Sequence, residues 1–181
     1  MGTDIHAFVE FDISQDEPFS VAENVRSLSS AELFLRRDYK LFDLLAGGRA
    51  CVDGRTWFKP MFPPRGLPMN CTREVVRRYG VTIDANCNLS QCCIPVPEIP
   101  RSRIADFLEK AKPLSEVDGS QLFENQNWRN PSWLLLCELK DILAGNAEIK
   151  PSTFLAILAA METLESEYGE HRTRLVFWFD N

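Results

Sequence analysis

The sequence predicts an α+β protein in which one mainly antiparallel sheet includes the strands at both ends of the chain. Two observations lead to this prediction. Apolar and polar residues alternate over residues 4–11 and again over 172–180, and the segments between them repeat apolar residues at helical spacing. Strands at the two ends with helices between them favour helices packed chiefly on one face. With 181 residues and no internal repeat, the chain is expected to form one domain over residues 1–181.

The two terminal strands each separate an apolar face from a polar one. The polar faces carry Asp4, His6 and Glu10 in the first strand, and Arg174, Trp178 and Asp180 in the second. Because one helix layer must cover both apolar faces, we expect the strands to be neighbours, with His6 about 5–8 Å between Cβ atoms from a residue of 174–180. A simple pairing of Arg174 with Asp4 or Glu10 would meet the same geometry without any function.

Helices are predicted where helical spacing coincides with capping signals. Gly47, Gly80, Gly145 and Gly169 supply stops, and Ser102, Ser132 and Pro151 supply starts. The predicted helices are residues 39–46, 72–79, 102–112, 132–145 and 151–169. A second strand is expected near 19–25, short strands near 81–83 and 94–96, and polar loop over 113–130. Residues 48–70, rich in Gly, Pro and Arg, predict a long structured loop.

Composition narrows the classes of function. The net charge of −6 argues against general binding to nucleic acids, and no apolar run reaches the ~18–20 residues of a membrane span. Without a signal-peptide pattern, a cytoplasmic protein with six reduced cysteines is expected. The common nucleotide-binding and hydrolase motifs are absent from the sequence.

A first candidate site lies on the polar face of the N-terminal strand. Asp4 and His6 are two residues apart and share a face with Glu10. A carboxylate and an imidazole at this spacing suit a divalent metal or an acid–base pair. The alternative is a solvated face with a hydrogen bond between Asp4 and His6.

A second candidate site is basic. Arg49 and Arg65 lie in the 48–70 loop, where Pro63, Pro64 and Gly66 restrict the backbone around Arg65. Arginine suits bidentate contacts with phosphate or carboxylate, and Trp128-Arg129-Asn130 offers stacking and hydrogen bonds to a base. The alternatives are loop arginines paired with the protein's own acids and a core tryptophan beside a helix cap.

Five blocks of the chain together resemble a family of uncharacterised proteins of bacteria and their phages. The family pattern is MGCDIHxxVE, RxYxLFxxLAGxR, RGLP, Ser-Trp-Leu and VFxFDN. It is matched by residues 1–10, 37–49, 65–68, 132–134 and 174–181. The resemblance draws attention to Arg37 and Asp180, which fall inside these blocks. The chain departs from the family pattern at two places. Thr3 replaces a Cys, and Asn-Trp-Arg-Asn at 127–130 replaces an Asp-x-His-Ser run.

Taken together, these patterns predict a protein that binds a small anionic molecule, such as a nucleotide. Phage proteins that sequester a signalling nucleotide of the host offer an analogy for this chemistry. The ligand residues would be Arg37, Arg49, Arg65, Trp128, Arg129 and Asp180. One alternative is a metal-assisted hydrolase with a divalent metal on Asp4 and His6 and with Glu10 or Asp180 as a further ligand or base. Another alternative is a protein-interaction module without a small-molecule site.

Overall fold

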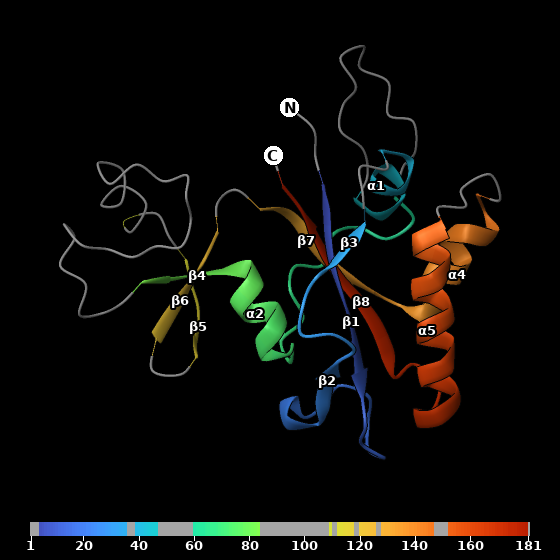
Figure 1. The fold of residues 1–181 in the computed structure, drawn as a ribbon, viewed down its shortest axis with the longest axis horizontal. Helices are drawn as coiled ribbons and strands as arrows, with labels where there is room; N and C mark the ends of the chain where they lie inside the picture. Colours follow the sequence, from blue (N-terminus) through green and yellow to red (C-terminus); the bar gives the residue numbers. More distant parts are fainter. Residues whose placement is uncertain are drawn as a thin grey trace, which may run out of the picture. The chain divides into compact units, whose positions relative to one another are not determined.

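The computed structural model describes residues 4–35, 39–46, 60–83, 109, 112–117, 120–125, 128–146 and 152–180. The chain divides into two compact units. The first combines Met1–Thr72 with Arg129–Asn181, and the second is Arg73–Trp128. Figure 1 shows strands and helices in both units, which confirms the predicted α+β class. The boundary of a single domain at residues 1–181 stays a prediction.

The first unit is built on an antiparallel sheet that contains both terminal strands, as the sequence predicts. Strand β1 (Ile5–Asp12) pairs along its length with β8 (Thr173–Phe179), and His6 lies opposite Trp178. The sheet order is β2-β1-β8-β7, and β3 also pairs with β1. The other strands are β2 (Val25–Ser27), β3 (Leu33–Leu35) and β7 (Arg129–Leu135), and the short 3₁₀ helix η1 (Ala22–Asn24) precedes β2.

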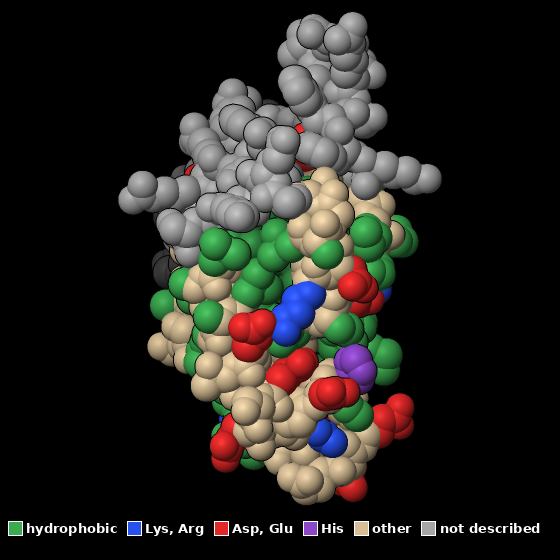
Figure 2. Space-filling view, turned by 90° about the vertical axis from the view of Figure 1, so that its right-hand side faces the viewer, with side chains coloured by type: hydrophobic (Ala, Val, Ile, Leu, Met, Phe, Trp, Pro, Cys, Tyr) green, Lys and Arg blue, Asp and Glu red, His purple; other side chains and the backbone are tan. Residues whose placement is uncertain are grey.

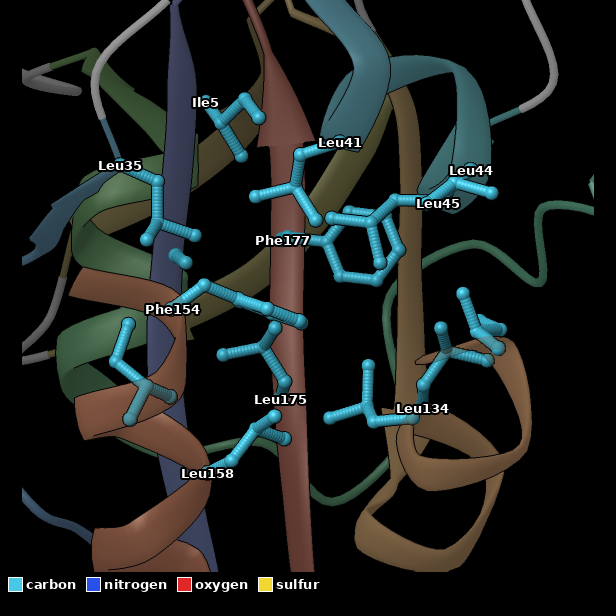
Figure 3. Packing of buried hydrophobic residues seen from close by; sticks show 14 of the residues in the cluster. Ile5, Leu35, Leu41, Leu44, Leu45, Leu134, Phe154, Leu158, Leu175 and Phe177 are labelled. Atoms are coloured by element: carbon cyan, nitrogen blue, oxygen red, sulfur yellow. The ribbon is translucent and has the colours of Figure 1, made fainter. Parts of the chain in front are cut away.

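Helices of the first unit cover one face of this sheet. They are α1 (Tyr39–Ala46), α4 (Leu136–Ala144) and α5 (Ser152–Tyr168), and Figure 1 shows them on one side of β1 and β8. Their apolar side chains interdigitate with those of the sheet (Figure 3), which include Ile5, Leu175 and Phe177. Burying each large side chain stabilises the fold by roughly 1.5–3 kcal/mol. No described helix is long and apolar enough to cross a membrane.

The opposite face of the sheet is also buried, although alternation predicts a half-buried strand. On this face Phe8 stacks against Trp178, with ring centroids 5.8 Å apart. Two chain segments contribute cover: Phe19 packs on Arg174, and the backbones of Asn70 and Thr72 bond to side chains of β8 and β1. Polar residues of both strands therefore lie inside the protein, where they need partners.

The second unit is a helix followed by a small antiparallel sheet. Helix α2 (Arg73–Tyr79) leads directly into β4 (Gly80–Ile83), and the sheet order is β4-β6-β5 with β5 (Pro113–Val117) and β6 (Ser120–Glu124). A Cβ at Gly80 would lie 2.9 Å from the Val76 carbonyl oxygen, so a side chain there requires the helix end to shift. The glycine therefore allows the tight change from helix to strand.

Three local predictions differ from the structure. The polar stretch 113–130 forms β5, β6 and the start of β7, because pairing between strands outweighs the low β-strand propensity of its polar residues. Residues 132–135 continue β7, so the next helix starts at Leu136 and not at Ser132. The second strand lies at 25–27, not at 19–25. The strand near 94–96, residues 48–59 of the predicted loop and the predicted helix 102–112, apart from residues 109 and 112, fall outside the described residues.

Candidate functional site

The pairing of β1 with β8 brings two aspartates to one end of the sheet. The Asp180 N–H donates to the Asp4 carbonyl at 3.3 Å, and the Asp4 N–H donates to Asp180 Oδ1 at 2.5 Å. These two bonds join residues 176 positions apart. Strand pairing thus fixes the Asp180 carboxylate beside the start of β1.

His6 lies between two carboxylates at the same end. Its Nδ1 is 2.9 Å from Glu32 Oε2, and its Nε2 is 3.7 Å from Asp180 Oδ2. The ring also stacks on Trp178 with centroids 6.2 Å apart. The His6 side chain is only 7% exposed, whereas Glu32 and Asp180 are 22% and 31% exposed. A buried imidazole is therefore oriented by carboxylates that reach solvent.

We refer to Asp4, His6, Glu32 and Asp180 as the terminal cluster. Its chemistry follows from its side chains, since carboxylates accept hydrogen bonds and an imidazole can donate, accept or carry a proton. The cluster can thus accept hydrogen bonds from the N–H or O–H groups of a ligand, while the His6 Nδ1 is held against Glu32. The structure brings the predicted Asp4, His6 and Asp180 together and adds Glu32.

Glu10, the third residue of the predicted polar face, is used inside the protein. Its carboxylate pairs with Arg174, with Nε and Nη2 at 2.8 and 2.7 Å from Oε2, while Oε1 accepts the Thr72 N–H at 2.6 Å. Arg174 also donates to the Asn70 carbonyl at 2.6 Å. Both charged side chains are almost fully buried, at 0% and 3% exposure. This is the simple pairing that the sequence allowed, and it leaves Glu10 closed to ligands from solvent.

Asp12 continues this internal arrangement. It accepts the backbone N–H groups of Ser14 at 2.8 Å and Phe19 at 2.5 Å, and Arg172 lies 3.8 Å away. Burial raises the pKa of Asp12, but the bonds from Ser14 and Phe19 and the charge of Arg172 outweigh burial, so the pKa lies below its usual value. The anionic form of Asp12 is therefore part of the folded loop that follows β1.

The Arg65 guanidinium is bound to the protein's own carboxylate. Its Nη1 and Nη2 atoms donate to Glu138 at 2.9 and 2.5 Å, and the group stacks 4.8 Å from the Trp133 ring centroid. Burial alone would raise the pKa of Glu138, but the hydrogen bonds from Arg65 and the Leu135 N–H have the larger effect, so the pKa lies below its usual value. The same Glu138 accepts the Leu135 N–H at 2.9 Å at the start of α4. These contacts match the alternative of a loop arginine paired with an acid.

The other predicted ligand residues are scattered. Arg129 is exposed at the start of β7, where it pairs with Phe179, the residue before Asp180. Trp128 belongs to the second unit, where the Arg78 guanidinium lies 5.2 Å from its ring centroid. Arg37 and Arg49 lie outside the described residues. Of the predicted basic site, the described part of the chain thus places Arg129 beside the strand that ends at the terminal cluster.

Sequence reasoning missed Glu32. The Ser30-Ala-Glu-Leu segment resembles a helix cap, whereas in the structure it leads into β3, whose first residue, Leu33, pairs with Ala7. The register of β3 against β1 brings Glu32 close to His6, and no local sequence motif predicts this register.

Across the described ranges, no group of three or more His, Cys, Asp or Glu side chains is arranged to hold a metal ion. The metal hypothesis for Asp4 and His6 therefore stays a prediction. Comparisons with protein-family models, curated proteins and solved structures found no match to this chain. The family resemblance of the sequence likewise stays a prediction, and function must be argued from the site.

Proposed function

We propose that this protein binds a small anionic molecule, such as a nucleotide, at the end of the central sheet that carries the terminal cluster. The observation behind the proposal is the buried His6 held between Glu32 and Asp180, whose carboxylates remain partly exposed. An arrangement of this kind orients acceptor groups toward solvent without requiring them to reorganise.

The charges at this end suggest how such a ligand would lie. Carboxylates repel a phosphate, so Glu32 and Asp180 would accept the amino or hydroxyl groups of the ligand. The anionic group would then contact arginine, which binds phosphate through paired N–H donors. Arg129 is exposed next to the last strand, and in the sequence Arg37 follows Leu35, the pairing partner of Ile5, by two residues.

Native mass spectrometry of protein purified without added ligand tests the proposal first, because a bound nucleotide adds a defined mass. Calorimetric titration with a panel of ribonucleotides and the matching nucleosides then measures affinity. Asp180→Asn and Glu32→Gln should each weaken nucleotide binding at least about tenfold, since a hydrogen bond to a charged group contributes ~1.5–3 kcal/mol. Arg129→Ala should lower the affinity for the nucleotides but leave the affinity for the nucleosides unchanged.

The matched control is Glu162→Gln. Glu162 is an exposed carboxylate on α5 whose ion pair with Lys140 is 2.8 Å long, so this variant removes the same charge away from the cluster. Equal affinity of Asp180→Asn, Glu32→Gln and Glu162→Gln for every tested nucleotide would contradict the proposal.

A metal-assisted hydrolase is the second candidate, because Asp180 and His6 lie 3.7 Å apart beside Asp4. Incubation of the same nucleotides with Mg²⁺ or Mn²⁺, followed by chromatography, separates it from pure binding. Metal-dependent product that disappears in Asp180→Asn supports the hydrolase. The absence of both binding and turnover leaves the interaction module as the remaining hypothesis.

A further inference from the structure

A second pair of reactive side chains lies away from the terminal cluster. Cys137, the second residue of α4, places its Sγ 3.5 Å from Nδ1 of His171. His171 belongs to the turn between α5 and β8 and is exposed, with φ of 62° in the left-handed region. Two elements distant in sequence thus bring a thiol and an imidazole together at the surface.

The separation of the two donor atoms matches the geometry of tetrahedral zinc. Zn–S bonds are about 2.3 Å and Zn–N bonds about 2.0–2.1 Å, so tetrahedral angles put a sulfur and a nitrogen ligand about 3.5–3.6 Å apart. The Cys137 and His171 atoms already have this spacing. A metal could bind them without changing the distance between the two donors.

The charges around the pair also favour a cation. Glu138, Glu165 and Asp141 all act electrostatically on the Cys137 sulfur. Glu138 is paired with Arg65, and the one basic side chain that acts on Cys137 among the described residues, Lys140, is itself paired with Glu162. Figure 2, which views the side of the molecule that carries α4 and α5, shows a histidine at the surface close to acidic side chains. Negative charge near a soft donor pair raises the local concentration of divalent cations.

The rival role for a Cys–His pair is a catalytic nucleophile, which requires a thiolate stabilised by nearby positive charge. Burial raises the pKa of the Cys137 thiol above its usual value, so the free thiolate is disfavoured when no metal is bound. A zinc ion supplies the positive charge that stabilises the thiolate, and its binding releases the thiol proton to solvent.

We propose that Cys137 and His171 form a surface site for a soft divalent cation, with Zn²⁺ as the best match. A thiolate and an imidazole are preferred zinc ligands, and two protein donors leave two tetrahedral positions for water or other donors. The site is independent of the function proposed for the terminal cluster, since the two share no residue.

Titration with Zn²⁺ alone, under reducing conditions, tests this site by calorimetry and by native mass spectrometry of the full chain. Cys137→Ser and His171→Asn each remove one donor, and Asn tolerates the left-handed conformation at 171. Each variant should bind one zinc fewer than the wild type, or bind it at least about tenfold more weakly. Cysteines elsewhere are the same in all variants, so their contribution cancels in the comparison.

Glu170→Gln is the matched control, because it changes the exposed neighbour of His171 in the same turn. It should keep the wild-type zinc stoichiometry. Co²⁺ provides a second readout, since a cobalt–thiolate charge-transfer band should be weaker in Cys137→Ser and His171→Asn than in the control. Identical zinc binding in all four proteins would overturn the proposal. Loss in Cys137→Ser with retention in His171→Asn would also overturn it, because it would indicate binding by a lone thiol.

Discussion

The two ends of strand β1 carry similar side chains but differ in how the protein uses them. At the C-terminal end of β1, which we call the inner end, the carboxylates of Glu10 and Asp12 lie near Arg174 and Arg172 and are completely buried. At the other end, the terminal cluster sets the carboxylates of Glu32 and Asp180 on either side of the His6 imidazole, and both carboxylates reach solvent. Both ends look alike in the sequence, as acids on one face of an alternating strand.

The difference shows how partners decide whether a polar face is structural or available for binding. The inner end meets guanidinium groups and backbone N–H donors from two loops, which satisfy its charges within the fold. The terminal cluster lies where the sheet ends, so its carboxylates keep access to solvent. The buried ion pairs give the inner end a structural role, and the exposed carboxylates of the terminal cluster are the ones that we propose bind a ligand.

The largest expected effect comes from breaking the inner pair. Arg174→Met leaves Glu10 buried without its charge partner, so the free energy of unfolding should fall by about 3–5 kcal/mol, measured by urea denaturation. The double variant Glu10→Leu with Arg174→Met removes both charges and should be more stable than the single variant. A loss below about 1 kcal/mol in Arg174→Met would mean that the inner end is not structural.

Asp12 should make the stability of the inner end depend on pH. Because its folded pKa is lowered from the usual 3.8, its contribution is complete above that value and is lost as the pH falls through the folded pKa. Asp12→Asn should cost about 1–3 kcal/mol at neutral pH. The difference in unfolding free energy between wild type and variant should shrink below about pH 4, where the unfolded carboxyl begins to bind its proton. A difference that stays constant down to pH 2 would contradict this assignment.

Arg65 provides an intermediate case, since its side chain is 26% exposed and its carboxylate partner 17%. Arg65→Ala removes two charge-assisted hydrogen bonds and the stacking on Trp133, so we expect a loss of about 1–2 kcal/mol. Thermal unfolding of Arg65→Ala and Glu138→Gln should show losses of similar size if the pair acts as a unit. A stable Arg65→Ala that fails to bind nucleotide would instead return Arg65 to the ligand site.

The smallest effect on stability is expected at the terminal cluster. Asp180→Asn keeps an oxygen for the Asp4 N–H and changes only the charge, so the free energy of unfolding should change by less than about 1 kcal/mol. The same variant is predicted to reduce ligand affinity, which separates binding from folding. A large loss of stability in Asp180→Asn would remove the contrast between the two ends.

The sequence predicts the parts of this fold that depend on local periodicity. The limits of α1 and α5 and the pairing of the terminal strands follow from apolar spacing and from the need for one shared helix layer. Strands β5 and β6 escape prediction because Ser115, Glu116 and Gln121 are poor strand formers, which cross-strand pairing overrides.

Only part of the candidate site is predictable. Asp4 and His6 share a face by strand periodicity, and the neighbouring strand brings Asp180. Glu32 depends on the register of a three-residue strand, and the occupation of Arg65 depends on Glu138, which is 73 residues away in the sequence. Pairings at that separation are properties of the tertiary fold, and residue types alone do not specify them.

The pairing of β1 with β8 has a consequence for how the chain folds during synthesis. Glu10 and Arg174 are 164 residues apart, so the central strand pair cannot form until the residues of β8 have left the ribosome. Until then the apolar face of β1 is exposed, and the Glu10 carboxylate lacks the Arg174 partner that it has in the folded protein. Long-range pairing of this kind slows folding and prolongs exposure to aggregation. In the described part of the Arg73–Trp128 unit, β4, β6 and β5 pair with one another, so these pairings do not have to wait for β8.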